Sequence, residues 1–135
     1  MEGTHSVDAT LTKTGSCAET CTELTDFWEE GIANIANGTF HDMQKLVKLN
    51  LHGNNIANLP ADIFKDNTEL ELLSLGYNNI ANLPADIFKY NTELANLYLY
   101  GNNIANLPAD IFKYNTELAE LQIFDNPLGV CLWCA

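Results

Sequence analysis

Two close pairs of cysteines are the residues of this chain best suited to covalent or metal chemistry. They are Cys17 with Cys21 and Cys131 with Cys134. Neighbouring thiols form disulfides or bind zinc and iron–sulfur clusters, and thiols that do neither are usually buried. We expect each pair to be a disulfide or two buried thiols, with no metal ion and no cofactor. A metal site at one end, or shared between two molecules, is the alternative.

Catalytic groups are not brought together anywhere in the sequence. The three histidines are scattered through the chain, at His5, His41 and His52. Asp62, Asp86 and Asp110 recur at a fixed spacing and have the oxygen ligands that Ca²⁺ prefers, but an acid present in every copy of a repeat follows from the copying alone. The sequence therefore predicts a protein that is not an enzyme.

An internal repeat dominates the organisation of the chain. Residues 79–93 recur without change as residues 103–117, and once more as residues 55–69 with Asp66 in place of a tyrosine. The period is 24 residues. Repetition at this length indicates stacked units, none of which can bury its apolar face alone.

The repeated unit has a leucine-rich pattern. Units begin at Leu46, Leu70, Leu94 and Leu118, and the first three read Leu-x-x-Leu-x-Leu-x-x-Asn-x-Ile-x-x-Leu-Pro-x-x-x-Phe. Alternating leucines predict a short strand with one face buried. The asparagine suits a buried turn, and the proline prevents the strand from continuing.

These units resemble the leucine-rich repeat family in its 24-residue extracellular form, as in the lymphocyte receptors of jawless fish and in Toll-type ectodomains. The resemblance covers roughly residues 32–128. It implies an α/β repeat solenoid, a right-handed coil with a parallel β-sheet on the concave face and irregular convex loops. Asn67, Asn91 and Asn115 stand where the family usually has leucine. We expect them to hydrogen-bond along the stack and to leave a looser, wetter convex side.

Four segments follow from this pattern. They are a flexible segment at 1–15, an N-terminal cap with a degenerate first repeat at 16–45, the repeats at 46–126 (46–69, 70–93, 94–117 and the partial 118–126), and an abbreviated C-terminal cap at 127–135. A capping box and helical spacing of apolar residues predict a helix over 17–30, with a strand around 25–28 as the alternative. The two caps lie about 20 Å apart at about 4.8 Å per strand, so cysteines of the two ends cannot share one site within a molecule.

The charge and the N-terminus limit the partners and the location. The net charge is −12, from 18 acidic residues and six lysines. Nucleic acid and anionic membranes require clustered basic residues, and no apolar run is long enough to span a bilayer. The first residues contain no signal peptide. The sequon Asn37-Gly38-Thr39 makes Asn37 a glycosylation candidate. We expect an extracellular or cell-surface protein whose leader is absent from this chain, and a cytoplasmic location stays open.

Nearly all variation between the repeats falls at strand positions that point away from the leucines. They read Lys48, Leu72, Asn96 and Glu120 in the third position, Asn50, Ser74, Tyr98 and Gln122 in the fifth, His52, Gly76, Tyr100 and Phe124 in the seventh, and Gly53, Tyr77, Gly101 and Asp125 in the eighth. Tyrosine mixed with Asn, Ser and Gly is typical of binding surfaces. Packing between strands is the structural explanation of the same exposed rings.

We therefore predict a non-catalytic module that binds a protein or another macromolecule on its concave face. The predicted contact residues are Lys48, Asn50, His52, Leu72, Ser74, Tyr77, Asn96, Tyr98, Tyr100, Glu120, Gln122, Phe124 and Asp125. The chain would act as a monomer or a weak end-to-end dimer. Two alternatives are a structural or engineered scaffold without a natural ligand, which near-perfect repeats favour, and end-to-end assembly through the cysteine-bearing caps, with or without a bridging metal.

Overall fold

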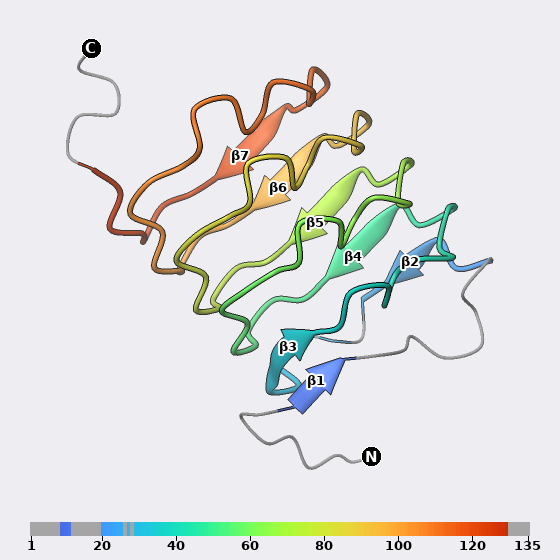
Figure 1. Ribbon diagram of the computed structural model, residues 1–135, viewed down its shortest axis with the longest axis horizontal. Coiled ribbons are helices and arrows are strands. Elements are labelled where there is room, and N and C mark those ends of the chain that lie inside the picture. Colours follow the sequence, from blue (N-terminus) through green and yellow to red (C-terminus); the bar gives the residue numbers. More distant parts are fainter. Residues whose placement is uncertain (1–8, 12–19, 26, 28, 130–135) are drawn as a thin grey trace.

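The computed structural model describes residues 9–11, 20–25, 27 and 29–129, and within them the chain forms short parallel strands joined by long loops. A five-stranded sheet follows the chain order β2-β4-β5-β6-β7, and a separate pair joins β1 to β3 (Figure 1). The strands are β1 Ala9–Leu11, β2 Glu23–Leu24, β3 Ile32–Ile35, β4 Lys48–Asn50, β5 Leu72–Ser74, β6 Asn96–Tyr98 and β7 Glu120–Gln122. The predicted repeat solenoid with a parallel sheet is confirmed.

The leucine columns fix the register of the sheet. Leu49, Leu73 and Leu97 pair with one another across β4, β5 and β6, and all three are fully buried. Their neighbours on either side in each strand face away from the core, because successive side chains of a strand point to opposite faces. The period of 24 residues therefore places equivalent side chains of successive repeats next to each other.

A column of phenylalanines fills the opposite side of the core. The rings of Phe40, Phe64, Phe88 and Phe112 stack in order, with successive centroids 6.2, 6.4 and 6.1 Å apart. The first three rings are fully buried. Burying a side chain of this size contributes about 1.5–3 kcal/mol, so this column is a large part of what holds adjacent repeats together.

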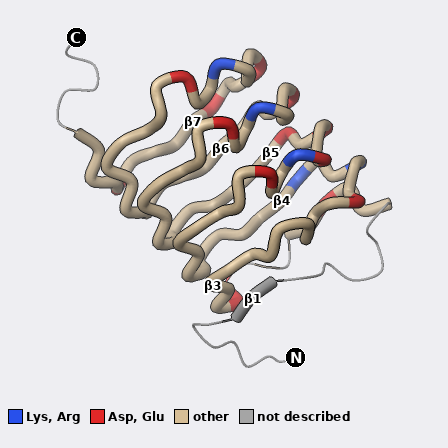
Figure 2. Tube along the Cα trace, viewed as in Figure 1, with Lys and Arg blue, Asp and Glu red and all other residues tan. Residues whose placement is uncertain are grey.

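Turns take the place of helices in the loops opposite the sheet. After Pro84 the backbone makes i to i+3 bonds, from the amide of Ile87 to Pro84 O at 3.2 Å and from that of Lys89 to Asp86 O at 3.1 Å. Acidic and basic residues of these loops recur in rows along the stack (Figure 2). Within the described residues there is no helix long and apolar enough to span a bilayer.

Two asparagine ladders run along the stack, and they differ in how well they are satisfied. In the ladder that follows the strands, Asn102 accepts from the amide of Ile80 at 3.0 Å and donates to Leu75 O and Leu99 O, each at 3.0 Å. Its acceptor and its donor both have partners. This confirms that the asparagine after each strand closes a buried turn.

The second ladder stands where the family pattern has leucine. Asn91 Nδ2 donates to Phe64 O at 3.0 Å and to Asn67 O at 2.9 Å, and Asn115 repeats both bonds one unit further on. The predicted bonding along the stack is confirmed. Asn67 and Asn91 are fully buried and Asn115 is 5% exposed, and the expected looser, wetter convex side stays a prediction. In the part of the chain that the structure describes, the Oδ1 atom of each of the three has no hydrogen-bond partner.

The N-terminal end differs from the expectation. The predicted helix over 17–30 is wrong for the described residues of that segment, which contain β2 instead. β2 pairs with β4 as Glu23 with Lys48, one residue more than the repeat period. Part of the segment predicted to be flexible, Ala9–Leu11, forms β1 and pairs with β3. A parallel strand rather than a helix thus extends the main sheet at this end.

Candidate functional site

The outer sheet face carries the side chains of the variable columns. We use this name for the face of the five-stranded sheet that points away from the buried leucines, which is the predicted concave face. The third-position residues lie side by side in register, as do those of the fifth position. The structure therefore brings these predicted contact residues together on one surface. Ser74 is only 6% exposed and forms part of the floor of this face.

Five rings form an aromatic cluster on this face: His52, Tyr77, Tyr98, Tyr100 and Phe124. Tyr100 lies at its centre, with ring centroids 6.0 Å from His52, 5.2 Å from Tyr77, 6.2 Å from Tyr98 and 4.9 Å from Phe124. His52 also contacts Tyr77, with centroids 5.3 Å apart. Tyr77 and Phe124 are 51% and 52% exposed. The cluster therefore combines internal ring packing with a large accessible aromatic surface.

Two glycines make room for this cluster. A Cβ on Gly76 would lie 2.5 Å from Cε1 of Tyr100, and a Cβ on Gly101 would lie 2.3 Å from Cδ1 of Tyr77. Both distances are shorter than atoms tolerate, so any larger residue would displace a ring. Sequence reasoning placed both glycines in variable columns but missed their role. The signal was the pair of reversed dipeptides, Gly-Tyr at 76–77 and Tyr-Gly at 100–101, one period apart.

The backbone at the eighth position is left-handed in successive repeats. Gly53 and Gly101 have φ of 75° and 70° there, whereas Tyr77 and Asp125 have φ of 53° and 57°. A left-handed residue with a side chain costs roughly 1–2 kcal/mol relative to glycine. Tyr77 therefore adopts a backbone conformation that favours glycine, and its ring contacts those of His52 and Tyr100.

A hollow of about 410 Å³ opens on the N-terminal side of the rings. It is lined by Thr25, Lys48, Asn50, His52, Leu72, Ser74, Tyr98 and Tyr100. Leu72 and Ser74 of β5 and two tyrosines of the next repeat are among these lining residues. Thr25 is a lining residue that sequence reasoning missed, since it lies outside the regular repeats. A hollow of this size accommodates one or two side chains of a partner.

Charges are unevenly distributed over this face. Lys48 lies at the N-terminal side and pairs with Glu23, with Nζ 3.8 Å from Oε2. At the other side, Glu120 accepts from Tyr98 Oη at 3.1 Å and from Gln122 Nε2 at 2.7 Å. Burial, and after it the hydrogen bond and the charge of Glu120, raise the pKa of the Tyr98 hydroxyl. The tyrosine therefore remains a donor to this carboxylate throughout the physiological range.

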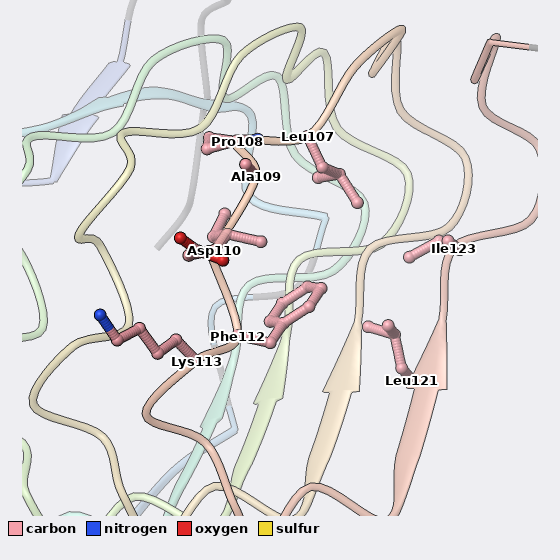
Figure 3. Close-up of a pocket in the computed structure, with 9 residues that line it drawn as sticks. Leu107, Pro108, Ala109, Asp110, Phe112, Lys113, Leu121 and Ile123 are labelled. Atoms are coloured by element: carbon pink, nitrogen blue, oxygen red, sulfur yellow. The ribbon is translucent and has the colours of Figure 1, made fainter. Parts of the chain in front are cut away.

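A second hollow lies at the C-terminal end of the core, not on the predicted site. It measures about 530 Å³, and its lining includes Leu107, Phe112, Lys113, Leu121 and Ile123 (Figure 3). Leu107, Phe112, Leu121 and Ile123 belong to columns that are buried in the preceding repeats. This hollow therefore lies at the C-terminal end of the described repeats and is lined by residues that keep the apolar types of their columns.

The remaining candidate sites lie away from the outer sheet face. Cys21 is disulfide-bonded, and its partner lies outside the described residues, as do Cys17, Cys131 and Cys134. Asn37 is exposed, and the hydroxyl of its sequon residue Thr39 donates to Ala36 O at 2.7 Å. These features do not contribute to the aromatic cluster.

One repeat difference is explained by an ion pair between loops. Asp66 replaces the tyrosine found at the same place in the next two units, and its Oδ2 lies 2.5 Å from Nδ1 of His41 in the preceding unit. Tyr90 and Tyr114 instead lie under lysines, Lys89 and Lys113, at 5.6 and 5.4 Å from the ring centroids. This column therefore holds a charged contact in every unit.

Comparisons with known proteins agree with this geometry. A family model described as leucine rich repeat matches residues 28–80, 44–104 and 68–128. No curated protein sequence matches the chain. The solved leucine-rich repeat domain of APL1 is 30% identical, with a TM-score of 0.75 over 77% of this chain. An LRIM1/APL1C complex is 29% identical with a TM-score of 0.75 over 80% of this chain, and a Toll–Spatzle complex from Drosophila is 29% identical with a TM-score of 0.72, also over 80%.

The chain is short beside these structures. It covers 28% of the APL1 domain, 20% of the matched chain in the LRIM1/APL1C complex and 14% of that in the Toll–Spatzle complex. The three overlapping family matches together run from residue 28 to residue 128, which is most of the sequence. The leucine columns, the phenylalanine stack and these matches lead to one conclusion: this chain belongs to the leucine-rich repeat family.

Proposed function

We propose that this chain is a non-catalytic recognition module that binds a protein ligand through its outer sheet face. The observation that carries the proposal is the aromatic cluster, which is built from residues that differ between otherwise nearly identical repeats. Tyrosines supply rigid, amphipathic contact area at a small entropic cost, and aromatic residues of this kind are frequent hot spots of interfaces.

The packing of the cluster supports a binding role over a purely structural one. Tyr100 contacts four other rings and is half-buried, whereas Tyr77 and Phe124 remain about half exposed. Rings held in this way need little further ordering when a partner arrives, which lowers the entropic cost of association. The hollow beside them offers a concave place for a partner's side chain.

The similar structures and the surface features agree with an extracellular protein-binding role. Two of the similar structures are complexes, LRIM1 with APL1C and Toll with Spatzle. An exposed sequon asparagine and a disulfide-bonded Cys21 are features of proteins from oxidising, secretory compartments. We therefore place this chain outside the cell or at its surface.

The test is a selection of binding peptides followed by comparison of variants. Peptides selected from a displayed library on the wild-type protein should lose binding to the double variant Tyr98→Ala/Tyr100→Ala. They should bind normally to Tyr90→Ala/Tyr114→Ala, which removes two exposed tyrosines from the opposite loops. Equal binding to both double variants, with both folded by circular dichroism, would show that the outer sheet face is not the recognition surface.

A further inference from the structure

We infer that the Glu120 side of the outer sheet face binds an arginine side chain of the protein partner. The inference rests on the proposed function and adds to it the chemistry of one contact. It starts from the carboxylate of Glu120, which is exposed on β7 at the edge of the aromatic cluster.

Neutral side chains hold this carboxylate in place. Tyr98 donates to its Oε1 at 3.1 Å, and Gln122 donates to its Oε2 at 2.7 Å. With the amide of Asn96 in the orientation that satisfies both its atoms, its nitrogen donates to the same Oε1 at 3.3 Å. All three donors belong to the variable columns. Together they fix the direction of the carboxylate without neutralising its charge.

No cation of the described residues compensates Glu120. In the described part of the chain, the ion pairs join His41 to Asp42 and Asp66, and Lys48 to Glu23, and none of them includes Glu120. Lys48 occupies the same column three strands away and contacts Glu23. Asp125, in the eighth position of the same unit, is a second exposed acid of the last strand segment. This side of the face is therefore anionic and lacks a basic partner.

An aromatic ring next to this carboxylate selects the type of cation. Tyr98, whose hydroxyl donates to Glu120, supplies that ring at the edge of the cluster. A guanidinium is planar, so it stacks on a ring face while it forms two parallel bonds to a carboxylate. The chain uses a related contact in its own loops, where Lys113 lies over the Tyr114 ring. The net charge of −12 also favours approach of a basic segment.

The experiment titrates the whole ¹⁵N-labelled chain with a short peptide that carries two arginines, at physiological ionic strength, and follows amide shifts by NMR. The matched peptide replaces both arginines with citrulline, which keeps the shape and removes the charge. We expect the arginine peptide to shift the amides of Glu120, Gln122, Phe124 and Asp125 in a saturable manner. The citrulline peptide should bind at least about tenfold more weakly, as expected for loss of one close charged contact.

Two variants separate a local contact from general attraction. Glu120→Gln and Glu117→Gln remove the same charge, but Glu117 lies on the loop before β7 rather than on the outer sheet face. We expect Glu120→Gln to weaken the arginine peptide about fivefold or more and Glu117→Gln to change it less than about twofold. Equal weakening by both variants, or equal binding of the citrulline peptide, would overturn the inference. Recognition by the outer sheet face would survive that result if Tyr98→Ala/Tyr100→Ala still abolished binding of the library peptides.

Discussion

The ring of Tyr77 meets the ring of Tyr100 edge to face, with centroids 5.2 Å apart and an interplanar angle of 74°. Each ring also lies against the glycine that stands in its own column in the other repeat, Tyr77 against Gly101 and Tyr100 against Gly76. In the seventh column the earlier repeat has the glycine and the later repeat has the tyrosine, and in the eighth column this order is reversed. A change in either glycine should therefore affect the rings without touching the leucine core.

Glycine-to-alanine variants can separate the cost of the backbone from the cost of the rings. Gly38 has φ of 92° with open space around it, Gly76 has only the ring contact, and Gly101 has both a φ of 70° and the ring contact. We expect Gly38→Ala to lower the free energy of unfolding by about 1 kcal/mol, from backbone strain alone. Gly101→Ala should cost more, about 2–3 kcal/mol, because the backbone and ring effects add.

Urea denaturation of the three variants measures these costs, and Gly129→Ala serves as the control with neither feature. Gly76→Ala and Gly101→Ala should also weaken peptides selected on the outer sheet face, because each displaces a ring. Unchanged binding by both variants would show that ring placement does not determine recognition.

Asn91 tests the half-satisfied ladder. Its amide nitrogen donates twice, but its buried Oδ1 has no hydrogen-bond partner among the described residues. The carbonyls of Phe64 and Asn67 each keep a backbone donor of their own. Asn91→Leu should therefore change the free energy of unfolding by less than about 1.5 kcal/mol, since the lost bonds are offset by burial of an apolar side chain.

Asn91→Asp should be far more costly, about 3 kcal/mol or more at neutral pH, because a buried carboxylate would face two acceptor oxygens. Burial would raise the pKa of the introduced carboxyl in the folded state above its unfolded value. The stability of this variant should consequently recover as the pH falls towards the unfolded pKa. Thermal melts at neutral and acidic pH measure both variants. Equal stability of Asn91→Leu and Asn91→Asp at neutral pH, with the same pH dependence, would refute this account of the ladder.

Tyr98 provides a prediction for alkaline pH. Burial first, and then the hydrogen bond and charge of Glu120, raise its pKa in the folded protein. The unfolded chain therefore loses this proton first as the pH rises. The contribution of Tyr98 to the free energy of unfolding is fully present below its unfolded pKa and is lost as the pH rises through its folded pKa. Tyr98→Phe should make stability fall less steeply over this alkaline range. Absorbance titration of the tyrosines should show one late-titrating hydroxyl that is missing from the variant.

The ion pair of His41 and Asp66 should contribute little to stability. His41 is largely exposed, with 67% of its side chain accessible, and exposed pairs are usually worth less than about 1 kcal/mol. Asp66→Tyr would restore the residue that the other units carry. We expect this variant to unfold within about 1 kcal/mol of wild type. A loss of several kcal/mol in urea denaturation would mean that the loop pair organises the first repeats.

The fold of the repeats could be predicted because comparing them shows which positions are shared and which vary. Leucines at a constant period define both the strand and its register, so the pairing of Leu49, Leu73 and Leu97 was already implied by sequence. The same contrast identified the outer positions that the aromatic cluster occupies. The ring-to-glycine contacts were not predictable in this way, because they depend on which direction each side chain leans across the strands.

The prediction of an N-terminal helix was wrong for a physical reason. Capping and helical spacing are local signals, and they were outweighed by pairing with the neighbouring repeat. Thr22 O accepts from the amides of Val47 and Lys48 at 2.7 and 3.0 Å, which satisfies the exposed edge of β4. A helix in this segment would have left those amides without partners.

The reversed glycine and tyrosine pairs also bear on how the chain finds its fold. The core of units 70–93 and 94–117 is nearly the same, so a nascent chain that loops out one unit would still bury leucine against leucine. Such a misassembled chain would remove Tyr77 and Gly76 from the stack, so Tyr100 would lose both its ring partner at 5.2 Å and the glycine that it lies against. Contacts on the outer sheet face therefore distinguish the correct order of the repeats, whereas the core contacts are the same in both arrangements. Loss of these contacts disfavours a misassembled state to which uniform repeats are otherwise prone.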